Sequence, residues 1–320
     1  MNGRPEVSVI VLSYKQADTV GRAIDSVLAQ RTSFPFEIVL CDDHSPDGTG
    51  EVCRRYAAEH PDVIRLVERP VNVGVVANYF DCMSRARGRF IADCAGDDYW
   101  LGTDSLQRLY NELQAHPEAV LAHADWQEVD ASTGAVTLAF DSAPRYREDV
   151  TDGRQLLERL LAHVRPFPVH LSAALYRLDI LREAMAENPE LVHNEAFGCE
   201  DLPLLAALLS RGPAVYVPHA TLAYTVAHDS VSRPADLEKA FWFYHRTAVC
   251  THTLAEAYGV ESAAVKSYLR ERVDILFAVA MRLRSSSLWK AAAAVSRLTG
   301  EPGSWKSRVR RLLKPFVIKR

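Results

Sequence analysis

The feature that most constrains the fold is a regular alternation of strand-like and helix-like segments between residues 7 and 125. Short apolar runs typical of buried strands occur at Val7–Ser13, Phe36–Cys41, Val63–Glu68, Arg89–Cys94 and Val120–His123. Segments with helical periodicity or helix-start signals separate them, at 18–28, 49–60, 74–85 and 105–115. Because the connections are short, the pattern predicts an α/β fold with a mostly parallel sheet flanked by helices.

Polar side chains gather where three of these predicted strands end. Ser13-Tyr14, Asp42-Asp43 and Asp97-Asp98 each follow an apolar run directly. Any one of them is also compatible with a polar surface turn. Ligands of parallel sheets bind beyond the carboxyl ends of the strands, and the shared placement of the three segments therefore favours a binding site.

The adjacent carboxylates of Asp97 and Asp98 indicate which ligand such a site would take. Neighbouring charges at the end of a buried strand repel each other and are unfavourable unless a cation or strong donors meet them. Hard divalent cations that also bind phosphate oxygens are the usual solution. We therefore expect a metal-assisted phosphate site, with an Asp-rich turn as the alternative.

Two common nucleotide-binding loops are missing from the sequence. No Gly-x-Gly-x-x-Gly follows the first predicted strand, which disfavours a dinucleotide fold, and no Gly-Lys-Ser/Thr occurs, which excludes the phosphate-loop ATPases. A nucleotide bound at this rim would be held by carboxylates, a metal ion and aromatic side chains.

The order of the motifs resembles the family 2 glycosyltransferases of the GT-A fold. The resemblance rests on Ser13-Tyr14, Glu37–Thr49, Asn72–Gly74 with Asn78, Gly88–Trp100, Gly198–Leu202 and Tyr224–Ser232. It implies a Rossmann-like nucleotide-sugar-binding half at 1–125 and an acceptor-binding, catalytic half at 126–233. The helical pattern of the remaining residues, 234–320, predicts a C-terminal extension with helices at 237–258, 262–284 and 288–298.

The resemblance also implies roles for the residues at the rim. The positions that it assigns to the nucleotide sugar are Ser13, Tyr14, Asp42, Asp43, Asn72, Gly74, Asn78 and Asp97, the last at the ribose. It places Asp98 at a Mn²⁺ or Mg²⁺ ion. Ala95 stands where the family often has an acid, and this departure concerns tight metal binding more than activity.

Three further positions follow from the resemblance. Asp201, with Glu200 as the second choice or orienting partner, corresponds to the general base, although two acids opening an apolar helix also serve as caps. His228 corresponds to a ligand of the metal or diphosphate, with a structural histidine as the alternative. Attack by an acceptor hydroxyl opposite the leaving diphosphate predicts inversion at the anomeric carbon.

The function expected is that of a metal-dependent, inverting glycosyltransferase using a UDP- or dTDP-linked sugar. Its acceptor would be a glycan or a lipid-linked molecule in cell-surface polysaccharide or glycoconjugate synthesis. A Gln-x-x-Arg-Trp motif and membrane spans are missing, so we expect one sugar per encounter. The alternatives are a catalytically degenerate nucleotide-sugar or glycan-binding scaffold and a sugar-phosphate nucleotidyltransferase.

The charge distribution bears on partners and location. Residues 281–320 contain eleven Lys or Arg and one acid, so the net charge of −4 leaves −14 on the rest, which argues against nucleic acid. The basic, partly apolar tail is compatible with an anionic membrane surface, a solvated tail or an oligomer contact. Six scattered cysteines and no recognisable signal peptide predict a cytoplasmic protein, either free or peripheral at the inner face of the plasma membrane.

Overall fold

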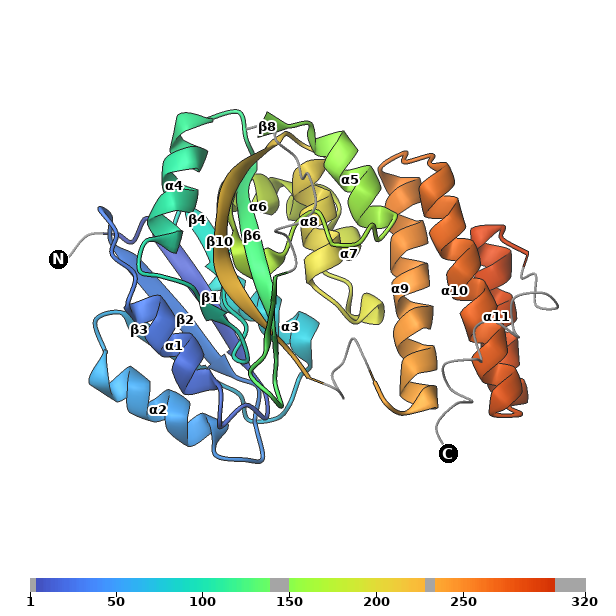
Figure 1. Cartoon of the computed structure of the whole chain (residues 1–320), viewed down its shortest axis with the longest axis horizontal. Coiled ribbons are helices and arrows are strands. Elements are labelled where there is room, and N and C mark those ends of the chain that lie inside the picture. Colours follow the sequence, from blue (N-terminus) through green and yellow to red (C-terminus); the bar gives the residue numbers. More distant parts are fainter. Residues whose placement is uncertain (1–3, 139–149, 228–233, 303–320) are drawn as a thin grey trace. The chain divides into compact units, whose positions relative to one another are not determined.

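The computed structural model describes residues 4–138, 150–227 and 234–302 (Figure 1). The chain divides into two compact units. The sheet unit comprises Met1–Leu157, Pro166–Glu195 and Cys199–Val226, and the helical unit comprises Glu158–Arg165, Ala196–Gly198 and Ala227–Arg320.

The sheet unit contains one large mixed sheet. Its first half is the predicted parallel arrangement, in the order β3 (Ile64–Glu68), β2 (Phe36–Asp42), β1 (Val7–Ser13) and β4 (Phe90–Asp93). The sheet continues with the antiparallel strand β9 (Ala174–Arg177), then β6 (Leu121–Asp130), β10 (Ala214–Val226) and β5 (Tyr99–Trp100). The short strands β7 (Val136–Leu138) and β8 (Val150–Thr151) pair with β6 and β10.

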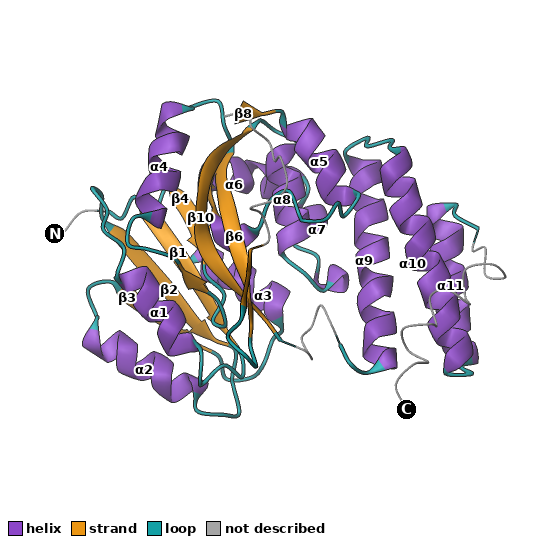
Figure 2. Ribbon diagram, viewed as in Figure 1, coloured by secondary structure: helices purple, strands orange, loops and turns teal. Residues whose placement is uncertain are grey.

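Helices cover this sheet in two layers (Figure 2). The helices α1 (Val20–Leu28), α2 (Thr49–Glu59) and α4 (Ser105–Ala115) share the main apolar core with one face. The helix α3 (Val75–Ser84) packs on β1 and β2, and α6 (Leu178–Glu187) packs against α7 (Pro189–Val192) and α8 (Asp201–Leu209). The helix α5 (Gly153–Leu161) spans the boundary between the two units. The fold is the α/β arrangement of a sheet flanked by helices that the sequence predicts.

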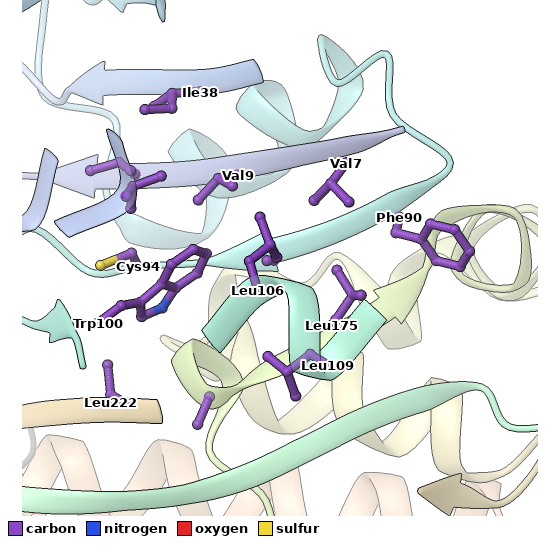
Figure 3. Close-up of a cluster of buried hydrophobic side chains, with 14 of the residues drawn as sticks. Val7, Val9, Ile38, Phe90, Cys94, Trp100, Leu106, Leu109, Leu175 and Leu222 are labelled. Carbon is purple, nitrogen blue, oxygen red and sulfur yellow. The ribbon is translucent and has the colours of Figure 1, made fainter. Parts of the chain in front are cut away.

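The main core explains why the apolar runs form strands. Val7 and Val9 of β1, Ile38 of β2 and Phe90 of β4 are buried on one face against Leu106 of α4 (Figure 3). Successive strand residues point to opposite faces, so the residues between them face the second helical layer. The parallel strands are therefore mainly apolar on both faces, with Ser8 of β1 and Glu37 of β2 as buried polar residues on the second face.

Some elements lie outside the sequence predictions. The strand β6 continues seven residues past His123, and the pattern gave no sign of α5, α6 or β10. In β10 the register with β6 shifts between Val217 and Ala220, on either side of Pro218. A proline has no N–H to donate to a neighbouring strand, and a β-bulge accommodates it. In the sequence alone, where the pairing with β6 is not visible, Pro218 indicates the end of a strand.

The helical unit contains the three helices that the periodicity predicts. They are α9 (Leu237–Ala257), α10 (Ala263–Arg282) and α11 (Ser286–Thr299). The side chains of Asp236, Ser262 and Ser285 accept from backbone N–H groups in the first turn of each helix, as good N-caps do. Within the described ranges, no helix is both long and apolar enough to cross a bilayer. Residues 303–320 of the predicted basic tail lie outside the described residues.

Candidate active site

The ends of three parallel strands form one rim. Ser13 pairs with Asp42 in the β1–β2 register, and the Asp43 N–H donates to the Ser13 carbonyl oxygen at 3.0 Å. On the other side of β1, the Gly96 N–H donates to the Leu12 carbonyl oxygen at 2.9 Å. The fold thus brings together the three polar segments that the sequence places at strand ends.

Asp43 organises the loop before α3. Its Oδ1 and Oδ2 accept from the N–H groups of Val73 and Gly74, both at 2.9 Å, and its carbonyl oxygen accepts from Asn72 Nδ2 at 3.0 Å. Gly74 has φ 84°, a conformation that side chains with a Cβ rarely adopt. Asp43, Asn72 and Gly74, three of the residues predicted to bind the nucleotide sugar, therefore form one hydrogen-bonded unit, which holds the loop against the end of β2.

The other predicted nucleoside contacts differ in exposure. Tyr14 is 42% exposed, and Lys15 Nζ lies 5.1 Å from the centroid of its ring. Asp42 is buried, and its carboxylate accepts from both the N–H and the hydroxyl of Ser45. The Ser13 hydroxyl points into the sheet, where it donates to the Cys41 carbonyl oxygen at 3.0 Å.

Asn78 lies inside the protein rather than at its surface. It is 2% exposed on α3, and its Oδ1 accepts from Arg69 Nε at 3.0 Å and from Cys41 Sγ at 2.8 Å. Arg69 also forms an ion pair with Asp81 at 2.7 Å. These contacts give Asn78 a supporting position, in which it anchors Arg69 at the start of the loop that follows β3.

The paired carboxylates after β4 have different surroundings. Asp98 is 1% exposed, and its Oδ1 accepts from the Thr225 N–H of β10 at 2.8 Å. Burial, and then repulsion from Asp97, raises the pKa of Asp98 well above its usual range. Asp97 is half-buried, and burial raises its pKa as well. Two neighbouring carboxylates that both resist ionisation would be relieved by a cation.

Arg22 is a residue of this region that sequence reasoning missed. Its Nη2 donates to the Asp97 carbonyl oxygen at 3.2 Å and to Thr225 Oγ1 at 3.3 Å, and its guanidinium lies 4.2 Å from the Tyr99 ring centroid. It therefore links α1, the loop after β4 and β10. Its only signal in the sequence is a place on the polar side of a predicted helix, which many surface arginines share.

The described residues fit a metal site in which the protein supplies only some of the ligands, and the ligand phosphate and water supply the others. Within residues 4–138, 150–227 and 234–302, no group of three or more His, Cys, Asp or Glu side chains could hold a metal ion. The half-buried Asp97 and the buried Asp98 supply two neighbouring carboxylates, which suit an ion that takes its other ligands from phosphate oxygens and water. His228 lies outside the described residues.

The predicted general base Asp201 and its partner Glu200 lie at the start of α8. Asp201 is exposed, and its Oδ1 accepts from the Leu202 N–H at 2.7 Å. Glu200 is half-buried, and burial together with repulsion from Asp201 and Asp93 raises its pKa to about 8.

Comparisons with known proteins agree with this architecture. The sequence profile described as glycosyl transferase family 2 matches residues 8–181. The chain is 30% identical to the succinoglycan biosynthesis protein ExoO of Rhizobium meliloti over 245 residues, 73% of this chain and 64% of that protein. It is 40% identical to an uncharacterised protein of Mycobacterium tuberculosis over 115 residues, 36% of this chain. This match spans about a third, 33%, of the mycobacterial relative.

Solved structures show the same fold. The structure of S. aureus TarS 1-349 in complex with UDP-GlcNAc matches with a TM-score of 0.63 and 18% identity, covering 97% of this chain and 85% of that one. The fold is therefore that of the GT-A glycosyltransferases. Since the family profile spans more than half of its residues, the chain belongs to glycosyl transferase family 2.

Proposed function

We propose that the protein is a metal-dependent, inverting glycosyltransferase that moves one sugar from a UDP- or dTDP-linked donor to an acceptor hydroxyl. The observation that carries the proposal is the meeting of Asp43, Gly96 and the end of β1 at one rim, next to the half-buried Asp97 and the buried Asp98. The names of two relatives support a role in the synthesis of cell-surface polysaccharides. One is a succinoglycan biosynthesis protein and another is the poly(ribitol-phosphate) beta-glucosyltransferase of Bacillus spizizenii, so we place this transfer in cell-surface polysaccharide synthesis.

The donor would bind along the rim. Tyr14 is exposed for stacking on the base, and the acids at the end of β2 offer acceptors to the imide N–H of uracil or thymine. Asp97 would meet the ribose, and Asp98, with His228, would hold Mn²⁺ or Mg²⁺. A bound ion of this kind neutralises charge on a leaving diphosphate.

Asp201 is the residue to which we assign the proton transfer. It is exposed, so an acceptor hydroxyl can approach it, and its proximity to Glu200 disfavours the loss of protons from both acids. Asp201 would take the proton of the acceptor hydroxyl while the oxygen attacks the anomeric carbon and the bond to the diphosphate breaks. A single displacement of this kind inverts the anomeric configuration.

The test is a transfer assay with a panel of nucleotide sugars, Mn²⁺ and acceptor extracts, scored by nucleoside diphosphate release and by the anomeric configuration of the product. Asp201→Asn is expected to lower the rate by about 10²–10⁴-fold, the usual contribution of a general base. Donor binding without any turnover would instead support the scaffold alternative, and pyrophosphate release from a nucleotide and a sugar phosphate would support the nucleotidyltransferase.

A matched control separates catalysis from helix capping. Asp179 occupies the first turn of α6, is exposed, and accepts from the Ile180 N–H at 2.9 Å, the same local contact that Asp201 makes in α8. Asp179→Asn is therefore expected to leave the rate unchanged. Equal losses in both variants, or a normal rate in Asp201→Asn, would refute the assignment of the base.

A further inference from the structure

Arg22 of α1 closes a ring of hydrogen bonds around the loop that follows β4. Its Nη2 donates to the carbonyl oxygen of Asp97 at 3.2 Å and to the hydroxyl oxygen of Thr225 at 3.3 Å. The N–H of Thr225 donates in turn to Oδ1 of Asp98 at 2.8 Å. Because Asp97 and Asp98 are consecutive, these three hydrogen bonds join the loop and β10 to one guanidinium. The residue that holds the carboxylate of Asp98 is therefore itself held by Arg22.

The helix α1 also contacts the segment that follows the two carboxylates. The Arg22 guanidinium lies 4.2 Å from the centroid of the Tyr99 ring, within the range of a cation–π contact. One turn further along α1, Ser26 Oγ accepts from the Trp100 N–H at 3.0 Å. Residues four apart lie on the same face of a helix, so Arg22 and Ser26 present one face of α1 to this segment. Tyr99 and Trp100 form β5, which pairs with β10. Both α1 and β10 therefore fix the loop and the strand after it.

The contacts of Arg22 fix the loop without occupying its acids. Arg22 donates to the main-chain oxygen of Asp97, so this hydrogen bond leaves the carboxylates of Asp97 and Asp98 for other ligands. A guanidinium keeps its charge in proteins and carries five N–H donors in one plane, so a single side chain can serve several acceptors and an aromatic ring. Arg22 is exposed, and these contacts order a side chain that would otherwise be solvated.

We propose that Arg22 is a positioning residue, which places the carboxylates of Asp97 and Asp98 for a divalent cation shared with a nucleoside diphosphate. The proposal rests on the proposed function, since that function assigns the cation to Asp98. In this role Arg22 does not touch the donor. Without Arg22, the loop and Thr225 would have to be ordered when the cation and the diphosphate bind. The loss would fall on metal-dependent binding, and contacts to the base from the ends of β1 and β2 would remain.

Calorimetric titration of the full chain with UDP, once with Mn²⁺ and once with EDTA, separates these two contributions. In Arg22→Gln the affinity with Mn²⁺ is expected to fall about tenfold, the lower end for hydrogen bonds from a charged group, and the affinity in EDTA to change by less than about twofold. Arg22→Lys keeps the charge and has three N–H donors, so it should recover most of the loss. A general loss of folded protein would weaken binding under both conditions.

Arg55 is the matched control for Arg22. It is exposed on α2, and its guanidinium lies 5.3 Å from the centroid of the Tyr56 ring, so it too is a helical arginine that stacks on a tyrosine. Arg55→Gln is expected to leave the affinity for UDP unchanged under both conditions. An equal loss in Arg22→Gln and Arg55→Gln would overturn the specific role of Arg22.

A second variant tests the hydrogen bond to β10. Thr225→Val removes the hydroxyl oxygen that accepts from Arg22 and keeps the N–H that donates to Asp98. It is expected to weaken UDP binding with Mn²⁺ as Arg22→Gln does. The double variant should lose less than the product of the two single losses, because both changes remove the same hydrogen bond. Independent losses would show that the bond between Arg22 and Thr225 does not position the acids.

Amide hydrogen exchange of the unliganded protein tests the positioning by itself. The Thr225 N–H should exchange faster in Arg22→Gln than in the parent, because the segment opens more easily. An unchanged exchange rate overturns the role of Arg22, and so does an unchanged affinity in Mn²⁺ where the parent responds to the metal. A parent that binds UDP no better with Mn²⁺ than in EDTA refutes the metal-dependent function instead, and the exchange rate still decides whether Arg22 orders the loop.

Discussion

At the scale of single residues, acids that look alike in the sequence differ in burial and in hydrogen bonding. Asp43 and Glu37 are buried and satisfied by hydrogen bonds, Asp93 is buried without them, and Asp201 is exposed at a helix start. Hydrogen bonds favour the charged form of a carboxylate, and burial disfavours it. A hydrogen-bonded carboxylate can therefore fix a loop, whereas a buried one without such bonds keeps its proton.

The Asn72–Gly74 loop should depend on both oxygens of Asp43. In Asp43→Asn one oxygen becomes an NH₂ group, so one of the N–H groups of Val73 and Gly74 loses its acceptor. We expect a loss of about 1–3 kcal/mol in the free energy of unfolding, measured by urea denaturation, and faster hydrogen exchange at these amides. Asp62→Asn, at an exposed position, is the control. Unchanged exchange would contradict the structural role of Asp43.

Glu37 and Asp93 should affect stability with opposite dependence on pH. Burial alone would raise the pKa of Glu37, but hydrogen bonds from Arg87 and Ser8 outweigh it and lower the pKa. The stabilisation from Glu37 is therefore present above its unfolded pKa and lost as the pH falls through the lower folded value. Asp93 has a raised pKa, so the folded protein keeps this proton while the unfolded chain releases it, and the free energy of unfolding falls as the pH rises from about 4 to about 7.

Denaturation of two variants across pH tests this contrast. Glu37→Gln is expected to be about 3 kcal/mol less stable than the parent at pH 7, near the lower limit for a broken buried pair because Arg87 is half-exposed. That deficit should shrink in acid, whereas the advantage of Asp93→Asn should grow toward alkaline pH. Parallel curves for the two variants would show that the environments of the two acids do not differ as described.

At the scale of elements, the rim depends on a close approach between the loop after β4 and the end of β1. A Cβ on Gly96 would lie 2.4 Å from Gln16 Oε1 and 2.9 Å from the Leu12 carbonyl oxygen. The loop that carries Asp97 and Asp98 can pass β1 at this distance only without a side chain at residue 96. The same contact holds the loop in the register in which Asp98 reaches Thr225.

Gly96→Ala should displace this loop. We expect a loss of about 1–3 kcal/mol in the free energy of unfolding, as for other overpacked sites, together with weaker donor binding measured by calorimetry. Gly48→Ala is the matched control, because its Cβ would meet only Ala17 Cβ at 3.7 Å and its φ is −76°. Normal donor affinity in Gly96→Ala would show that the position of the loop is unimportant for binding.

At the scale of the whole molecule, the distribution of acids predicts that metal and donor bind together. The described parts of the chain offer a carboxylate pair and no cluster of three or more metal-ligating side chains. Mn²⁺ alone should therefore bind weakly, while the diphosphate completes its ligands.

A thermal-shift matrix checks this expectation with the unmodified protein. Mn²⁺ alone and UDP alone should raise the melting temperature little, and the two together should raise it by more than the sum, because bound ligand stabilises the native state by mass action. EDTA should remove the joint effect. A strong shift with Mn²⁺ alone would point to a complete metal site in the protein itself.

The local pattern was sufficient for much of the fold. The first four strands, α1 to α4 and α9 to α11 follow from apolar periodicity and helix caps, because these signals depend on neighbours in sequence. Strand ends were also predictable, and with them the meeting of Asp42, Asp43 and the loop after β4. Strand β10 was not, because its bulge around Pro218 makes sense only beside β6.

What the sequence determined by itself is therefore the class of fold and the residues at its rim. Only the tertiary structure decided the surroundings of each residue: that the carboxylate of Asp43 accepts from the Val73 and Gly74 N–H groups, that Asn78 is buried and accepts from Arg69, and that Asp93 is buried away from solvent. The physical reason is that periodicity is a property of neighbouring residues. The pKa and the hydrogen bonds of a carboxylate depend instead on groups that folding brings from distant parts of the chain.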